Sequence, residues 1–101
     1  MIILATQWTP YNKTNEWFNV FKEVQGKIPS TITKWQSFAS TDEDKGIKGY
    51  NLIMTKKENA EEALMDISKM LAPFWKIEGF AMKIEVLFSM RDAIKVLGKS
   101  L

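Results

Sequence analysis

Apolar residues recur with two different periods along the chain, and the change of period predicts its elements. Four segments are rich in β-branched residues or alternate between apolar and polar residues, which favours strands at 2–8, 31–39, 47–55 and 81–88. Three other segments repeat apolar residues at the spacing of an amphipathic helix. Their apolar positions are Trp17, Val20, Phe21, Val24 and Ile28; Ala60, Ala63, Leu64, Ile67, Met70 or Leu71, and Phe74; and Ala93, Ile94 and Leu97.

Capping and turn residues mark the boundaries of these elements. Thr14 or Asn15 is suited to cap the first helix, and Asn59 and Ser89 precede the other two. The polar run 40–46 is short and ends in a glycine, so we expect the strands on either side of it to form a hairpin.

The resulting order is β-α-β-β-α-β, followed by a short terminal helix. This order is typical of the α+β class and of the ferredoxin-like, or split βαβ, arrangement, in which two helices cover one face of a four-stranded antiparallel sheet. The sequence contains no internal repeat and no linker rich in Pro or Gly. We therefore expect residues 1–101 to form a single ferredoxin-like domain.

Alternation within the strands predicts two unequal faces of the sheet. We assign these residues to the helix side: Trp35, Tyr50, Leu52, Met54, Met82, Ile84, Val86 and Phe88. We assign these to the uncovered side: Ile3, Ala5, Gln7, Lys34, Gln36, Phe38, Gly49, Asn51, Ile53, Lys83, Glu85 and Leu87. The uncovered set is too apolar for a face in water and too polar for a dry core.

A second copy of the chain would account for that mixture. Two sheets packed face to face would form an eight-stranded dimeric α/β barrel with a partly polar lumen, and the closure would protect the edge strands. We expect a homodimer through the uncovered sheet face, because a contiguous exposed apolar patch usually marks an interface. The alternative is a monomer with an apolar open face.

The composition removes several kinds of chemistry. The chain has no Cys and no His. It therefore has no disulfide, no thiol nucleophile and no thiolate metal site, and it lacks the commonest general base, metal ligand and haem ligand. We expect no metal site and no cofactor.

Charge and hydropathy narrow the range of partners. The formal net charge is +2, the lysines are scattered, and Arg91 is the one arginine. Nucleic-acid-binding proteins usually cluster Lys and Arg, so we expect no nucleic-acid partner. The N-terminal apolar run is too short for a signal peptide or a membrane span, which favours a cytoplasmic protein with no membrane partner.

Polar side chains on the predicted uncovered face are candidate ligand-binding residues. Gln7, Gln36, Asn51 and Glu85 would point into a barrel lumen, and Trp8 ends the first strand just before a proline loop. Glu85 is the only candidate catalytic residue, since an enclosed carboxylate is suited to accept a proton near neutral pH.

Each of these candidates has a structural alternative. Lys83 or Lys34 lies on the same predicted face as Glu85 and would form an ion pair with it. The acidic run 42–46 begins like a calcium-binding loop but has Ile53 where that loop needs Glu, which favours a simple turn. Aromatic residues would line a pocket for a flat apolar ligand or fill the core, namely Trp8, Trp35, Tyr50, Phe74 and Trp75.

The element order and four segments carry a family resemblance. The segments are ATQWTP (5–10), DKGIKGYNLI (44–53), KIEGFAMKIEV (76–86) and AIKVLG (93–98). The chain resembles the dimeric α/β-barrel superfamily of ferredoxin-like proteins and, more narrowly, small archaeal proteins of that type with no characterised activity. The superfamily includes cofactor-free monooxygenases, haem-degrading monooxygenases, muconolactone isomerase-like proteins and stress-response modules. Its haem-degrading members bind iron through a His, which this chain lacks.

The sequence as a whole favours a homodimeric ferredoxin-like module that binds a small apolar or aromatic ligand, or a protein partner, without catalysis. Two alternatives stay open. One is a cofactor-independent monooxygenase or isomerase that acts on an aromatic or polyketide-like substrate, and the other is a purely structural interaction domain. An enzyme predicts a cavity that touches Trp8, Asn51 and Glu85, whereas a structural domain predicts a filled lumen.

Overall fold

The computed structural model describes residues 1–99 of the chain. Its strands are β1 (Ile2–Thr9), β2 (Ile32–Asp42), β3 (Gly46–Thr55) and β4 (Ala81–Leu87). Its α-helices are α1 (Thr14–Val24), α2 (Ala60–Leu71) and α3 (Met90–Val96). Short 3-10 helices stand before α1, before α2 and after α2, and they are η1 (Tyr11–Lys13), η2 (Lys57–Asn59) and η3 (Ala72–Lys76).

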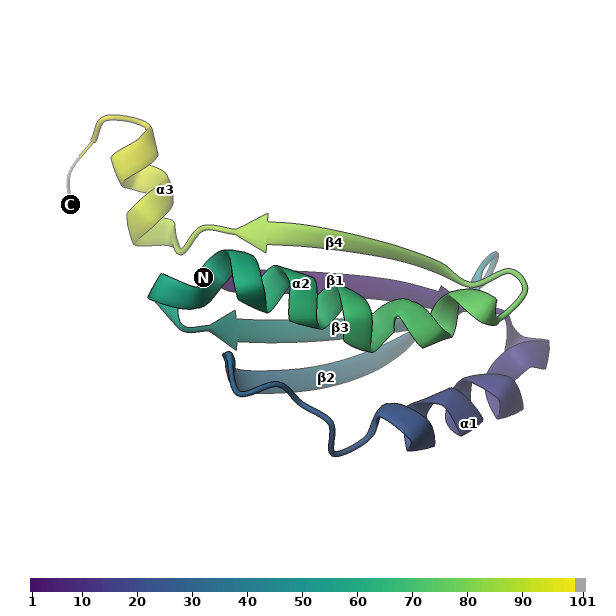
Figure 1. The fold of residues 1–101 in the computed structure, drawn as a ribbon. Coiled ribbons are helices and arrows are strands. Elements are labelled where there is room, and N and C mark those ends of the chain that lie inside the picture. The colour runs from purple at the N-terminus through teal and green to yellow at the C-terminus, as the bar shows by residue number, and fades with distance from the viewer. Residues whose placement is uncertain (100–101) are drawn as a thin grey trace.

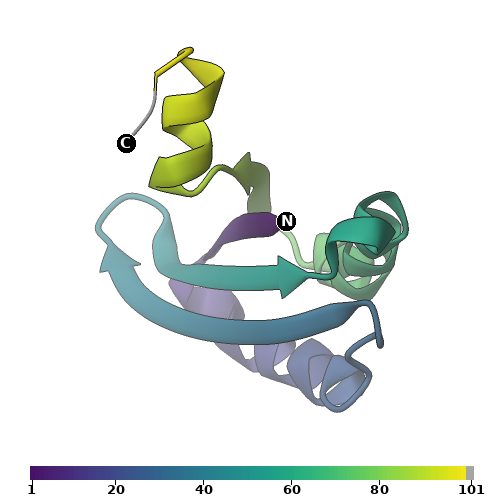
Figure 2. The same ribbon diagram turned by 90° about the vertical axis from the view of Figure 1, so that its left-hand side faces the viewer.

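The strands form one antiparallel sheet in the order β2-β3-β1-β4. Figures 1 and 2 show α1 and α2 on the same side of this sheet, with α3 apart from both at the end of β4. The predicted α+β ferredoxin-like fold is therefore confirmed. No helix in residues 1–99 combines the length and the apolar character that a membrane span requires.

The hairpin between β2 and β3 is longer than the sequence predicted. Pairing continues to Asp42 and Gly46, which leaves a turn of only three residues. The Asp42 carboxylate shapes this turn, because its Oδ1 accepts hydrogen bonds from the backbone N–H groups of Asp44 (3.0 Å) and Lys45 (3.1 Å). Gly46 has a φ of +101°, and a Cβ there would overlap the carbonyl oxygen of Thr9, so the close approach of the hairpin to β1 requires glycine.

One of the three predicted caps is confirmed. Ser89 Oγ accepts a hydrogen bond from the Asp92 backbone N–H at 3.1 Å at the start of α3. α1 instead begins directly after η1, with Lys13 at its N-cap position and no side-chain cap, so the expected cap by Thr14 or Asn15 is wrong. Asn59 does stand at the N-cap of α2, but its side chain contacts the Glu62 carboxylate rather than the backbone.

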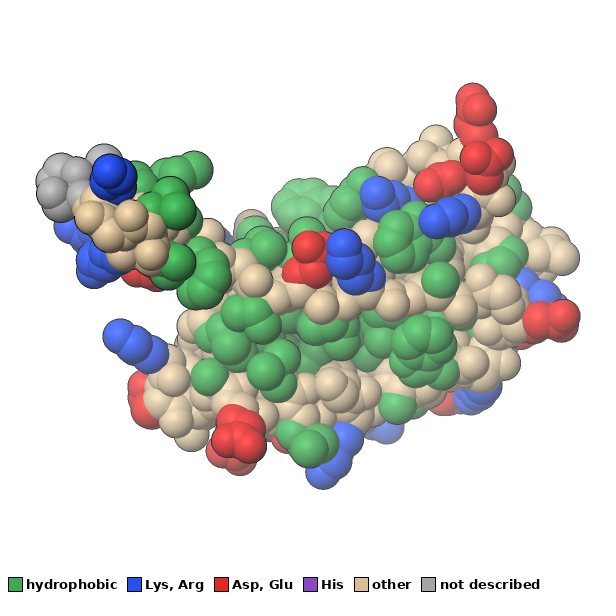
Figure 3. Space-filling view, turned by 90° about the horizontal axis from the view of Figure 1, so that it is seen from above, with side chains coloured by type: hydrophobic (Ala, Val, Ile, Leu, Met, Phe, Trp, Pro, Cys, Tyr) green, Lys and Arg blue, Asp and Glu red, His purple; other side chains and the backbone are tan. Residues whose placement is uncertain are grey.

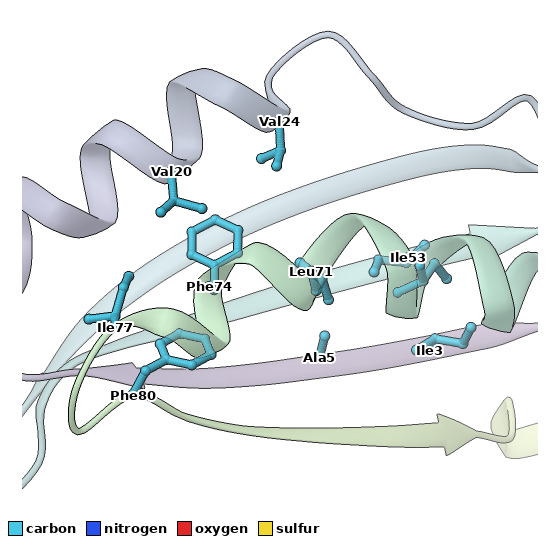
Figure 4. Close-up of a cluster of buried hydrophobic side chains, with 10 residues drawn as sticks. Ile3, Ala5, Val20, Val24, Ile53, Leu71, Phe74, Ile77 and Phe80 are labelled. Atoms are coloured by element: carbon cyan, nitrogen blue, oxygen red, sulfur yellow. The ribbon is translucent and has the colours of Figure 1, made fainter.

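The hydrophobic core lies between the sheet and the chain from α2 to β4. Figure 4 shows apolar side chains of β1 and β3 facing α2 and η3, with two valines of α1 pointing toward Phe74. The rings of Phe74 and Phe80 stack with their centroids 5.8 Å apart. The buried members of this cluster are Ile3, Ala5, Val20, Val24, Ile53, Ile67, Leu71, Phe74, Ile77 and Phe80.

The predicted phase of β1 and β3 is wrong. Ile3, Ala5 and Ile53 are fully buried under the helices rather than on the uncovered side. Since side chains alternate along a strand, Leu52 and its neighbours at every second position point the other way. The pattern misled because the side chains of β3 that face the helices include a polar residue, Asn51. The alternate set, Tyr50, Leu52 and Met54, is more apolar and yet lies on the other face.

The other face of the sheet has no helix over it within residues 1–99, and we call it the open sheet face. Register places on it Ile2, Leu4, Thr6 and Trp8 of β1; Lys34, Gln36, Phe38 and Ser40 of β2; Lys48, Tyr50, Leu52 and Met54 of β3; and Ala81, Lys83, Glu85 and Leu87 of β4. The expected positions on β2 and β4 are therefore confirmed. Figure 3 shows apolar side chains gathered in several patches on the β4 side of the molecule and on α3.

Candidate functional site

A cavity of about 790 Å³ separates α1 from the sheet. The helix is held at one side, where Val20 and Val24 pack toward Phe74 of η3 (Figure 4). The rest of its inward surface faces β2, β3 and the end of β1 across the cavity. This volume lies within the usual range for sites that bind small molecules.

The walls of the cavity are largely aromatic. Trp17 and Phe21 of α1 stack with their ring centroids 5.2 Å apart and an angle of 11° between the ring planes. Trp17 also meets Phe74 at 6.1 Å, so one continuous aromatic surface runs from α1 to η3. Phe18 of α1 and two residues of β2, Trp35 and Phe38, complete this aromatic lining. Flat rings arranged in this way are suited to enclose another flat apolar group.

The floor of the cavity is polar, and Asn51 of β3 organises it. Its Oδ1 accepts hydrogen bonds from Trp35 Nε1 (3.1 Å) and from Ser37 Oγ (2.9 Å). Its Nδ2 donates to the carbonyl oxygen of Ala5 on β1 at 3.2 Å. Three strands are thus joined through one buried amide, and the donors and acceptors of Asn51 are largely used within the protein.

Gln7 lies beside this network and differs from Asn51 in its partners. It lines the cavity from β1, is 9% exposed, and its Oε1 is buried without a hydrogen-bond partner. Among the bonds formed within residues 1–99, none involves the Gln7 side chain. Its amide is therefore an unpartnered polar group of this floor, and its oxygen would have to turn toward the cavity to bond a ligand.

Every residue that lines the cavity within residues 1–99 is neutral. None of its lining residues is Lys, Arg, Asp, Glu or Tyr. The site can therefore enclose an apolar body and bond it at a polar floor, but the lining offers no side chain suited to take up or release a proton near neutral pH. This arrangement fits binding better than acid–base chemistry.

The structure separates the five site residues that the sequence predicted. Gln7 and Asn51 lie together in the cavity, although on the covered face rather than on the uncovered one. Trp8, Gln36 and Glu85 lie on the open sheet face, away from the cavity.

Glu85 and Trp8 of the open sheet face have partners among neighbouring lysines. Glu85 forms an ion pair with Lys83, with Oε1 3.7 Å from Nζ, as the structural alternative expected. Trp8 packs against two lysine ammonium groups, Lys45 at 5.1 Å and Lys48 at 5.4 Å from its ring centroid. Among the aromatic candidates, Trp35 and Phe74 line the cavity, whereas Trp8, Tyr50 and Trp75 do not.

Sequence reasoning missed the contribution of α1. It placed Trp17 and Phe21 in the apolar stripe of the helix without predicting that both line a cavity, and it left Phe18 out of that stripe. One signal was available: this helix carries three aromatic residues within five positions, more ring surface than a two-layer core of this size needs.

Comparisons with known proteins concern the fold alone. No protein-family model matches the sequence, and no curated protein matches it either. Among solved structures, the chain is similar to a protein described as a putative PII-like signalling protein from Thermus thermophilus, at 11% identity and a TM-score of 0.44 over 91% of each chain. It is also similar to a DUF3240 family protein from Shewanella baltica, at 10% identity and a TM-score of 0.34, over 87% of this chain and 91% of that chain.

Proposed function

We propose that the protein is a ligand-binding module that encloses a small, flat, predominantly apolar molecule between α1 and the sheet. The observation that carries this proposal is the 790 Å³ cavity with aromatic walls, a polar floor and no charged lining residue. A domain of this size with a purely structural role has no need to hold α1 away from its sheet, since burying the same aromatic surface would add stability.

A neutral fluorescent probe tests this proposal directly. N-phenyl-1-naphthylamine is expected to bind the purified protein with a rise in its emission and quenching of tryptophan fluorescence, because Trp17 and Trp35 line the cavity. Native mass spectrometry of the same preparation would reveal a molecule that co-purifies with the chain.

Two neighbouring residues of β2 supply a matched pair of variants. Ala39 lines the cavity, whereas Ser40 pairs with Lys48 on the opposite face. Ala39→Phe should fill part of the cavity and weaken probe binding by roughly tenfold, and Ser40→Phe should leave it unchanged. Equal binding by both variants, or no binding by the wild type, would overturn the proposal.

We also propose that a second copy of the chain covers the open sheet face. The centre of this face is apolar, with Leu4 and Leu52 directly paired on the two inner strands, and charged residues such as Lys34 and Lys83 lie on the edge strands. An apolar centre with a polar rim is the usual composition of a protein interface.

The amount of exposed surface agrees with this assembly. The chain exposes 6991 Å², whereas a folded monomer of 11.7 kDa should expose about 5,900 Å². Its radius of gyration is 15.3 Å, against about 13 Å for a compact domain of this length. The excess area is comparable with the roughly 800 Å² that each partner buries in a standard interface. Light scattering at micromolar concentration should give twice the mass of the chain, and a species near 11.7 kDa would refute the dimer.

A further inference from the structure

The position of Gln7 is costly unless something bonds its amide. A buried amide oxygen without a hydrogen bond destabilises a fold, because it has lost its water partner and gained none within the protein. Gln7 has such an oxygen, and its side chain lines the cavity. Asn51, which lines the same floor from β3, has its oxygen bonded twice. Two other buried atoms within residues 1–99 lack a partner, Trp8 Nε1 and Thr55 Oγ1, but Gln7 is the residue of these three that lines the cavity.

The neighbouring strand leaves space for the Gln7 side chain. Gly49 of β3 is paired with Gln7, and a Cβ added to Gly49 would lie 3.1 Å from both Cγ and Nε2 of Gln7. Gly49 does not have a positive φ, so the backbone conformation does not call for glycine at this position. The absence of a side chain at Gly49 instead leaves room for the Gln7 amide.

The lining also limits the charge of the ligand. A carboxylate or an ammonium group that entered this cavity would lose part of its hydration without meeting an opposite charge. A neutral ligand loses much less, and its polar groups need only a hydrogen-bonding partner. The Gln7 amide can bond either a donor or an acceptor of the ligand, because it has two N–H donors and one carbonyl acceptor.

Combining these observations, we propose that the cavity selects a neutral, planar ligand whose ring carries a lactam edge, with an N–H beside a C=O, and that Gln7 recognises that edge. This inference rests on the proposed function and names the ligand class of that site. The ligand N–H donates to Gln7 Oε1, and the Gln7 Nε2 group donates to the ligand carbonyl. The terminal torsion of a glutamine side chain is soft, so the amide can turn its oxygen toward the cavity when a donor is present. Aromatic rings of α1 and η3 then enclose the planar body of the ligand.

Three probes of similar size and shape test this selection. They are naphthalene, which has no polar group; 2-quinolone, which has a lactam edge; and 2-naphthoate, which is anionic. We expect 2-quinolone to bind roughly tenfold more tightly than naphthalene, as two hydrogen bonds to a buried amide allow. We expect 2-naphthoate to bind at least roughly a hundredfold more weakly than 2-quinolone. Quenching of tryptophan fluorescence and chemical-shift changes measure all three affinities.

Variants of Gln7 and Gly49 show whether the preference comes from the amide. Gln7→Leu should lose the preference for 2-quinolone over naphthalene, because leucine offers neither a donor nor an acceptor. Gly49→Ala should reduce that preference by pushing the amide out of place, since the added Cβ would crowd it. Unfolding in urea shows that each variant is folded.

The outcomes separate this inference from the proposed function. If the wild type binds none of the three probes, the cavity is not a ligand site and the proposed function fails. If it binds naphthalene and 2-quinolone equally, or if Gln7→Leu keeps the preference, the ligand site stands and its recognition by Gln7 is refuted.

Discussion

Each of the two faces of the sheet departs at one place from the pattern of most half-covered antiparallel sheets. Such a sheet usually places apolar side chains under its helices and polar side chains in water. Here the covered face includes the buried amides of Gln7 and Asn51, whereas the open face centres on Leu4 and Leu52. Each exception coincides with a feature of the fold, because the amides lie at a cavity and the leucines lie where no element within residues 1–99 covers them. Departures from ordinary patterning thus mark the two places where we propose that the protein meets another molecule.

The largest effect should come from a charge placed on the covered face. Ile53 is fully buried between the sheet and the helices. Ile53→Glu removes a packed side chain and buries a carboxylate, which should cost about 4 kcal/mol or more and leave little folded protein. Far-ultraviolet circular dichroism during urea titration measures the loss. An unfolding midpoint equal to that of the wild type would mean that the two faces are assigned wrongly.

The same substitution one residue earlier should have a different consequence. Leu52 lies on the open sheet face, so Leu52→Glu should leave the fold largely intact and weaken self-association by at least about 2 kcal/mol. Light scattering across a dilution series gives the dissociation constant. Met65→Glu is the matched control, since Met65 is an exposed apolar residue of α2 and lies outside that face. If Leu52→Glu self-associates as strongly as this control, a second copy does not bind through the open sheet face.

The order of the elements was predictable because local signals agree with one another. Alternation in β4 and the helical spacing in α2 depend on each segment alone, and the Ser89 cap depends on a side chain and a nearby backbone group. The phase of β1 and β3 was not predictable in this way. It depends on which of the two alternating sets of side chains faces the helices. Asn51 can lie on the helix side because Trp35 and Ser37 of another strand donate hydrogen bonds to it.

The cavity was harder still to predict. An apolar stripe on a helix predicts that the stripe is covered, but not that it packs directly on the sheet. In α1 only Val20 and Val24 are buried, while Trp17 and Phe21 extend over the cavity. Of the site residues proposed from sequence, Gln7 and Asn51 lie together because β1 and β3 are paired and both residues are on the covered face. Trp8, Gln36 and Glu85 have the opposite phase from these two and so lie on the open face.

A moderate effect is expected from removing the amide that joins three strands. Asn51→Leu leaves Trp35 Nε1 and Ser37 Oγ without their shared acceptor, which should lower the free energy of unfolding by about 2 kcal/mol. Gln36→Leu makes the same kind of change at an exposed position of the open face and should stay within about 0.5 kcal/mol of the wild type. Urea unfolding compares the two variants. Equal losses would show that Asn51 does not hold the cavity floor in place.

The smallest effect should come from α3, which belongs to neither face. No residue of α3 is buried, and the helix stands apart from α1 and α2 in Figures 1 and 2. Ser89→Ala removes the hydrogen bond to the Asp92 N–H and should weaken this helix by about 1 kcal/mol, so its amide hydrogens exchange roughly fivefold faster. The unfolding midpoint of the sheet should not change, because α3 contributes no buried side chain to the core.

The same variant tests whether α3 takes part in the dimer. Met90 and Val96 are 75% and 69% exposed, so a second copy that covered α3 would slow its hydrogen exchange when the dimer forms. Hydrogen exchange above and below the dissociation concentration therefore separates a helix that stands free in the dimer from one that forms part of its interface.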